Sequence, residues 1–101
     1  MKTPELNEES LIDQIAYLSG KEWTNICHPQ SHEERILRRA SVWAFSQFLS
    51  LEPNGLCKRF NIQAQQSVRR ILKNKNLPED EYNWRILIRK RIRLEEKTAA
   101  A

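Results

Sequence analysis

Residues 52–75, EPNGLCKRFNIQAQQSVRRILKNK, decide the fold of this chain. Their apolar residues recur three or four positions apart in two groups: Leu56 and Phe60, then Val68, Ile71 and Leu72. This spacing predicts two short amphipathic helices, 55–60 and 66–75, joined by a tight turn over 61–65. Two such helices with an aliphatic residue, Ile62, buried in the turn are typical of a helix-turn-helix. We therefore expect a helix-turn-helix over residues 54–75.

Upstream of this motif, the same period predicts a helix over residues 8–19. Four apolar residues fall on one of its faces: Leu11, Ile12, Ile15 and Leu18. Gly20 is a natural end for the helix, because glycine readily adopts the left-handed conformation found there. Residues 21–31 then form a connector, from which we expect Trp23 and Ile26 to pack inward.

A longer helix is predicted over residues 32–51. Ser31 can cap it, and Glu34 completes a capping-box pattern three residues later. Its apolar residues cover so much of the surface that it belongs at the centre of the domain: Ile36, Leu37, Ala40, Val42, Trp43, Ala44, Phe45, Phe48 and Leu51. We expect Arg35, Arg38 and Arg39 to project from its first turns.

The segment 79–96 has two interpretations. Six of its apolar residues occupy even positions, which is the period of a strand: Tyr82, Trp84, Ile86, Ile88, Ile92 and Leu94. Its composition is that of a helix, however, and a lone strand would need a partner that this chain does not offer. We favour the helix. The strand would imply a dimer formed by strand exchange.

Length and composition place these elements in one all-α domain. The chain has 101 residues, too few for two domains, and its two glycines disfavour a turn-dense β-sandwich. No apolar run approaches the roughly 20 residues that cross a bilayer, and the N-terminus has no apolar core of a signal peptide. We expect a cytoplasmic, nucleoid-associated helical bundle, with residues 76–101 as a basic extension.

Charge is segregated along the chain, whose net charge is +4. Residues 1–34 hold two basic and seven acidic side chains, whereas residues 56–94 hold eleven basic and three acidic ones. Such segregation creates a positive face, for which a polyanion is the natural partner.

In a helix-turn-helix the second helix lies in the major groove, with its first residues facing the base edges. The candidate base-contacting residues are Ala64, Gln65, Gln66 and Ser67. Glutamine can pair with adenine through two hydrogen bonds, and alanine suits the thymine methyl group. Phosphates would be contacted by nearby cations: Lys58, Arg59, Arg69, Arg70, Lys73 and Lys75. These contacts supply affinity and salt dependence rather than sequence choice.

Residues 52–73 resemble the C-terminal DNA-binding domain of the bacterial replication initiator DnaA and, more loosely, the Trp-repressor group. Phe60, Ser67 and Val68 fall without a gap on the Phe, the second Thr and the Val of that family's motif, Phe-Gly-Gly-Arg-Asp-His-Thr-Thr-Val. Residues 15–18 and 22–23 resemble the domain's first helix and connector, and residues 38–48 its long central helix. The resemblance implies a helical fold with a DNA-facing surface.

The chain departs from that family where bases are read. The family's Arg-Asp-His-Thr is replaced here, so the resemblance does not imply the same DNA target: the residues are Gln63, Ala64, Gln65 and Gln66. The family's basic connector is also replaced by residues 27–34, and no ATPase domain is present. We therefore expect a DNA-binding protein without initiator activity.

Other kinds of site find little support. The spacing of Cys27, His28, His32 and Cys57 matches no standard zinc finger, so we expect reduced thiols and no metal. Without a Gly-rich phosphate loop or a recognisable nucleophile and base, we expect neither catalysis nor a cofactor.

The sequence thus predicts sequence-specific binding to double-stranded DNA by a transcriptional regulator or a phage or mobile-element accessory factor. Homodimerisation is a further expectation, because one helix-turn-helix contacts few base pairs and two-fold symmetric dimers commonly extend the contact. The alternative is a protein-interaction adaptor, with the acidic N-terminal helix and residues 84–94 as its surface. RNA binding fits the charge but lacks exposed aromatic platforms.

Overall fold

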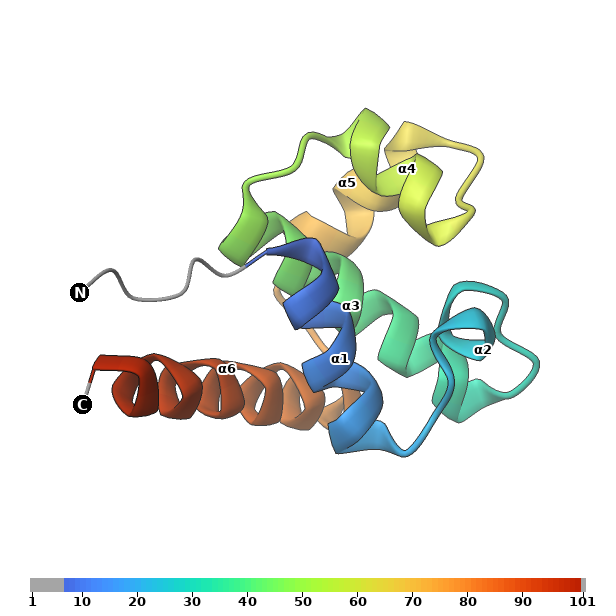
Figure 1. The fold of residues 1–101 in the computed structure, drawn as a ribbon. Helices are drawn as coiled ribbons and strands as arrows, with labels where there is room; N and C mark the ends of the chain where they lie inside the picture. Colours follow the sequence, from blue (N-terminus) through green and yellow to red (C-terminus); the bar gives the residue numbers. More distant parts are fainter. Residues whose placement is uncertain (1–6, 101) are drawn as a thin grey trace.

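The computed structural model describes residues 7–100, with side chains through Leu94. These residues form six helices and no strand: α1 (Glu8–Ser19), α2 (Trp23–Cys27), α3 (His32–Leu49), α4 (Pro53–Phe60), α5 (Gln65–Lys73) and α6 (Glu79–Ala100). The all-α class is therefore confirmed. Figure 1 shows α3 in the middle of the molecule, with α4 and α5 above it and α6 below.

Helix α1 has the bounds that the sequence predicts. The side chain of Asn7 caps its start by accepting a hydrogen bond from the Ser10 amide at 2.8 Å. Leu11 and Ile15 are fully buried. Gly20 ends the helix in the left-handed conformation, with a φ of 68°, as expected for a residue that has no Cβ.

The connector after α1 contains a helix that the sequence analysis missed. One and a half turns, α2, place Ile26 and Cys27 in the core, and Trp23 is half-buried. The Trp23 ring stacks on Phe45 at a centroid distance of 5.6 Å and meets the edge of Phe60 at 5.4 Å. Inward packing of this segment was thus predicted correctly, but its periodicity is too short to show a helix.

Helix α3 contacts all five of the other helices, which confirms its predicted central position. Ser31 caps it by accepting a hydrogen bond from the Glu34 amide at 3.2 Å. The Glu34 carboxylate accepts one from the Gln30 amide at 2.9 Å. The Glu34 side chain therefore bonds to the amide of Gln30, the residue before the N-cap, whereas a capping box would bond it to the amide of Ser31 itself. The helix ends at Leu49, two residues earlier than predicted, and its C-cap residue Ser50 has a φ of 54°.

Helices α4 and α5 form the predicted pair of short helices, with small shifts of their bounds. Helix α4 begins at Pro53 rather than residue 55, because proline is well accommodated in the first turn of a helix. Helix α5 runs one residue earlier at its start and ends two residues earlier than predicted. Both helices pack on α3 and on each other.

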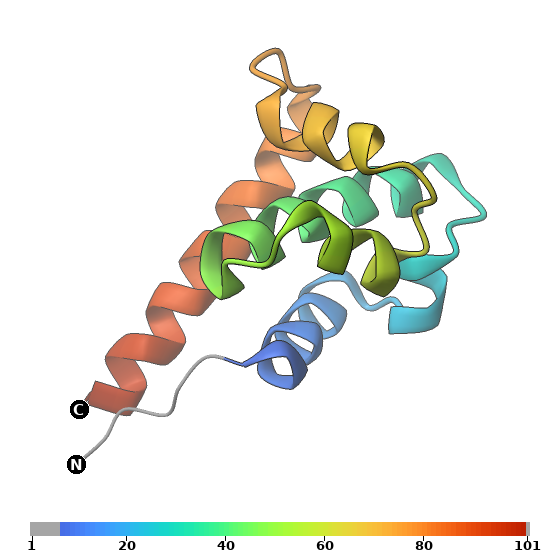
Figure 2. The same cartoon turned by 90° about the horizontal axis from the view of Figure 1, so that it is seen from above.

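The ambiguous C-terminal segment is a helix, so the strand and its exchange dimer are wrong. Helix α6 packs along α3 and α1, and at its C-terminal end it extends beyond them (Figure 2). Ile88 and Ile92, four residues apart, are 1% exposed, whereas Tyr82 and Leu94 are more than half exposed. The alternation in the sequence therefore did not mark the buried face.

Polar residues complete the buried face of α6 and conceal its helical period. Glu81 is 1% exposed and pairs with Arg39 of α3 at 2.6 Å and with Arg85 at 3.3 Å. The guanidinium groups of Arg85 and Arg89 lie over the Trp43 ring, 5.1 and 5.3 Å from its centroid. Burial lowers the pKa of Arg85, and the neighbouring Glu81 opposes this shift.

None of the helices within residues 7–100 is long and apolar enough to span a lipid bilayer.

Candidate nucleic-acid interface

The turn between α4 and α5 fixes the direction in which α5 leaves the core. Asn61 ends α4 in the left-handed conformation with a φ of 54°, which asparagine tolerates better than most residues. The Cys57 carbonyl accepts hydrogen bonds from the amides of both Asn61 and Ile62. Ile62 packs against the core but is only half-buried, so the predicted burial of this residue in the turn is confirmed in part.

Helix α5 has one face in the core and the opposite face in solvent. Val68 is fully buried, and Ile71 and Leu72 pack partly buried beside it. Four residues on the other face are exposed: Gln66, Arg69, Arg70 and Lys73. Gln66 and Lys73 each lie three or four positions from Arg69 and Arg70, the spacing that aligns side chains along one side of a helix.

The predicted base-contacting residues lie together at the start of α5. Ala64 is the N-cap residue and provides no side-chain cap, and the first helical residues follow it directly. All four candidates are exposed: Ala64, Gln65, Gln66 and Ser67. The side chains of Gln65 and Gln66 therefore face solvent, while the Ser67 amide donates a hydrogen bond to the Ala64 carbonyl at 3.0 Å.

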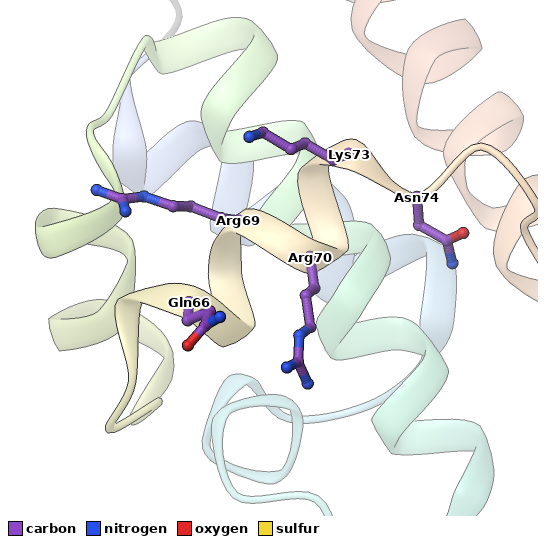
Figure 3. A pocket seen from close by; sticks show the side chains of 5 residues that line it. All are labelled: Gln66, Arg69, Arg70, Lys73 and Asn74. Atoms are coloured by element: carbon purple, nitrogen blue, oxygen red, sulfur yellow. The ribbon is translucent and has the colours of Figure 1, made fainter.

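The outward face of α5 borders an open hollow of about 700 Å³ (Figure 3). Its lining residues are Gln66, Arg69, Arg70, Lys73 and Asn74. A smaller hollow of about 330 Å³ adjoins it, sharing Arg70 and Asn74 and reaching Arg39 of α3. Asn74 was not among the sequence candidates, although its position, one turn after Arg70, could have indicated it.

Unlike Arg39, Arg59 and Arg85, the cations of α5 have no acidic partner among the described residues. Within the part of the chain that the structure describes, the side chains of Arg69, Arg70 and Lys73 make no hydrogen bond or ion pair. Lys75, just past the end of α5, is also exposed. The charge of this surface is thus available to an external anion rather than used in folding.

Of the two α4 candidates, the structure separates Arg59 from the α5 cluster. The Arg59 side chain is 35% exposed and pairs with Glu8 of α1 at 2.7 Å. It also donates a hydrogen bond to the Gly55 carbonyl at 3.2 Å. Lys58, by contrast, is exposed. Arg59 therefore holds α4 to α1 and offers less charge to a ligand than its neighbour.

The two cysteines, one on α2 and one on α4, are buried free thiols. The Cys27 thiol donates a hydrogen bond to the Arg59 carbonyl at 3.3 Å. Burial raises the pKa of the Cys27 thiol, and the nearby Arg38 partly opposes the shift. Among the described residues, no three His, Cys, Asp or Glu side chains gather in a way that could hold a metal ion.

Comparison with models of protein families, with curated proteins and with solved structures found no match for this chain.

Proposed function

We propose that the chain binds double-stranded DNA in a sequence-specific manner, with α5 in the major groove. The observation that carries this proposal is the outward face of α5, where exposed cations without acidic partners surround an exposed glutamine. Elsewhere in the described chain, arginines such as Arg39 and Arg59 are neutralised by glutamates. A surface of free cations and amide groups suits a ligand that has both phosphates and base edges.

The shape of the surface supports the same proposal. An α-helix with its side chains is about 10–12 Å across, and the major groove of B-DNA is about 12 Å wide. Helix α5 lies on the outside of the molecule, and its exposed face is unobstructed over the hollow of Figure 3. Lys58 on α4 and Lys75 just past the end of α5 are exposed, and we propose that they contact phosphates beside the groove.

The biological setting belongs to the proposal as well. A transcriptional regulator or a phage or mobile-element accessory factor in the cytoplasm, associated with the nucleoid, is the setting that fits a small DNA-binding domain. The likeness to the DnaA domain remains a proposal about fold, supported by a long central helix followed by two short ones. We also propose homodimerisation on a two-fold symmetric site, because a single helix-turn-helix contacts only a few base pairs.

The test compares two lysine variants by fluorescence anisotropy on duplex DNA over a range of salt concentrations. Lys73→Gln should lower affinity and reduce the slope of log K against log salt by about one, because one phosphate contact is lost. Lys90→Gln removes the same charge from an exposed position on α6 and should leave the slope unchanged. Equal slopes for both variants and the wild type would refute α5 as the DNA-binding surface.

The alternative, a protein-interaction adaptor, is favoured by one observation. Large apolar side chains are exposed on α1 and α6, which pack together: Tyr17, Tyr82, Leu87 and Leu94. An adaptor would ignore DNA at physiological salt and would co-purify with a protein partner. The same anisotropy measurement therefore separates the two functions.

A further inference from the structure

Helix α5 presents two rows of side chains that differ in chemistry. Gln66 and Arg70, one turn apart, form the first row, and Arg69 and Lys73 form the second. In Figure 3, Arg70 extends toward the side on which Gln66 lies, whereas Arg69 and Lys73 extend together toward another side. Both rows lie away from the buried Val68, so a duplex against α5 would meet both.

The first row contains the two side chains best suited to reading bases. A glutamine amide donates to and accepts from adenine, and an arginine guanidinium donates two hydrogen bonds to guanine. Both pairings need a planar group that is free of internal partners, and Gln66 and Arg70 have none within the described residues. The second row consists of two cations, one of them a lysine, whose ammonium group acts on phosphates as a point charge.

The first row ends at Arg70. Asn74 would be its next member, but its side-chain oxygen accepts a hydrogen bond from the Asn76 amide at 3.1 Å. Asn74 is also the C-cap residue of α5, with extended rather than helical backbone angles. Its amide therefore stabilises the loop before α6, and two side chains remain for base contact.

Building on the proposed DNA binding, we infer that Gln66 and Arg70 read base edges, while Arg69 and Lys73 contact phosphates. The preferred site then contains an adenine and a guanine close together. Four residues of helix rise about 6 Å, and base pairs are about 3.4 Å apart, so the two bases are one or two base pairs apart. Arg70, which the sequence predicts to contact phosphates, is thereby assigned to base recognition.

The experiment begins with selection of preferred duplexes from a randomised library by the wild-type chain. Affinities of the wild type, Arg70→Ala, Arg70→Lys and Arg69→Ala are then measured on the selected duplex and on one with the guanine replaced. Arg69→Ala is the matched control, because it removes the same exposed and unpaired group from the adjacent position of the same helix. Circular dichroism checks that each variant retains its helix content.

The wild type should prefer the guanine-containing duplex by roughly 5- to 140-fold, the range expected for one bidentate pair. Arg70→Ala should lose this preference. Arg70→Lys should keep part of it, because its ammonium group can still donate to guanine but lacks the planar fork of the guanidinium. Arg69→Ala should weaken binding to both duplexes by the same factor and keep the preference.

Two outcomes would overturn the inference while leaving DNA binding intact. One is a wild type that binds duplexes without preference. The other is that Arg70→Ala and Arg69→Ala each lower the affinity for both duplexes by the same factor. Absence of any duplex binding by the wild type at low salt would instead overturn the proposed function on which the inference rests.

Discussion

At the scale of single residues, the described chain uses polar side chains in two distinct ways. Some complete the fold: Ser31 and Glu34 fix the start of α3, and Glu81 holds Arg39 and Arg85 together. Others, such as Gln66 and Arg70, contribute nothing visible to packing. Exposed residues without partners are not required for the fold, so Gln66 and Arg70 remain available to a ligand.

Glu34 gives a pH-dependent prediction. The hydrogen bond from the Gln30 amide, with help from Ser31, lowers the pKa of the Glu34 carboxyl below its ordinary value. The stabilisation is therefore complete above the unfolded pKa of about 4.3 and is lost as the pH falls through the lower, folded pKa. Relative to wild type, Glu34→Gln should be less stable at pH 7, with a smaller difference near pH 3, as measured by urea denaturation.

The control for this measurement is Glu33→Gln, which removes a carboxylate from the same turn of α3. Glu33 is exposed, and its substitution changes the charge near the helix start without removing the bond to Gln30. A stability difference for Glu34→Gln that stays constant between pH 7 and pH 3 would contradict the role assigned to its charge.

The candidate residues could be predicted from the sequence, but their partners could not. The exposure of Gln66 follows from the helix period, because two residues separate it from the buried Val68 by about half a turn, whereas Ala64, one turn before Val68, is exposed as the N-cap residue. The pairing of Arg59 with Glu8 joins residues 51 positions apart, and no local pattern indicates it. Such long-range pairs depend on how the helices pack, which the sequence does not show residue by residue.

At the scale of elements, periodicity located the helices whose buried faces are apolar. It failed for α2, which is too short to repeat its pattern, and it was ambiguous for α6. In α6 the buried face includes Glu81 and Arg85, so the apolar period is interrupted where ion pairs replace apolar contacts. Cap residues marked helix ends more reliably, as Gly20 and Ser31 show.

The two glycines should respond in opposite directions to alanine. Gly20→Ala should destabilise the chain by about 1 kcal/mol, because residue 20 has a φ of 68° that side chains with a Cβ disfavour. Gly55→Ala should stabilise it by about 0.5 kcal/mol, since Gly55 lies within α4 and the new Cβ would meet only the end of the Arg59 side chain at 3.4 Å. Thermal unfolding measures the sign of the stability change in each variant, and the same sign for both would refute the assigned backbone conformations.

A second pair of variants tests the packing of α6. Ile88→Ala should cost about 2–5 kcal/mol, because Ile88 is 1% exposed between α6 and the core. Leu87→Ala, at a position that is 45% exposed, should cost less than about 1 kcal/mol. The difference is measured by urea denaturation. Equal losses of stability at these adjacent positions would contradict the orientation of α6.

At the scale of the whole molecule, charge and packing are divided between different surfaces. The acidic N-terminal part contributes Glu8, which pairs with Arg59, whereas α5 keeps its cations free. Net charge alone would not distinguish this arrangement from a uniformly charged soluble surface. On α5, three cations without partners among the described residues lie around side chains that can pair with bases.

The central claim is that the outward face of α5 binds double-stranded DNA. The most direct test is fluorescence anisotropy of the wild-type chain with random-sequence duplex DNA at two salt concentrations, about 50 and 200 mM. With three to five phosphate contacts, affinity should fall by roughly 40- to 500-fold between these concentrations, because each contact releases bound counterions. Absence of binding at the lower salt concentration would contradict the claim and move the search to protein partners.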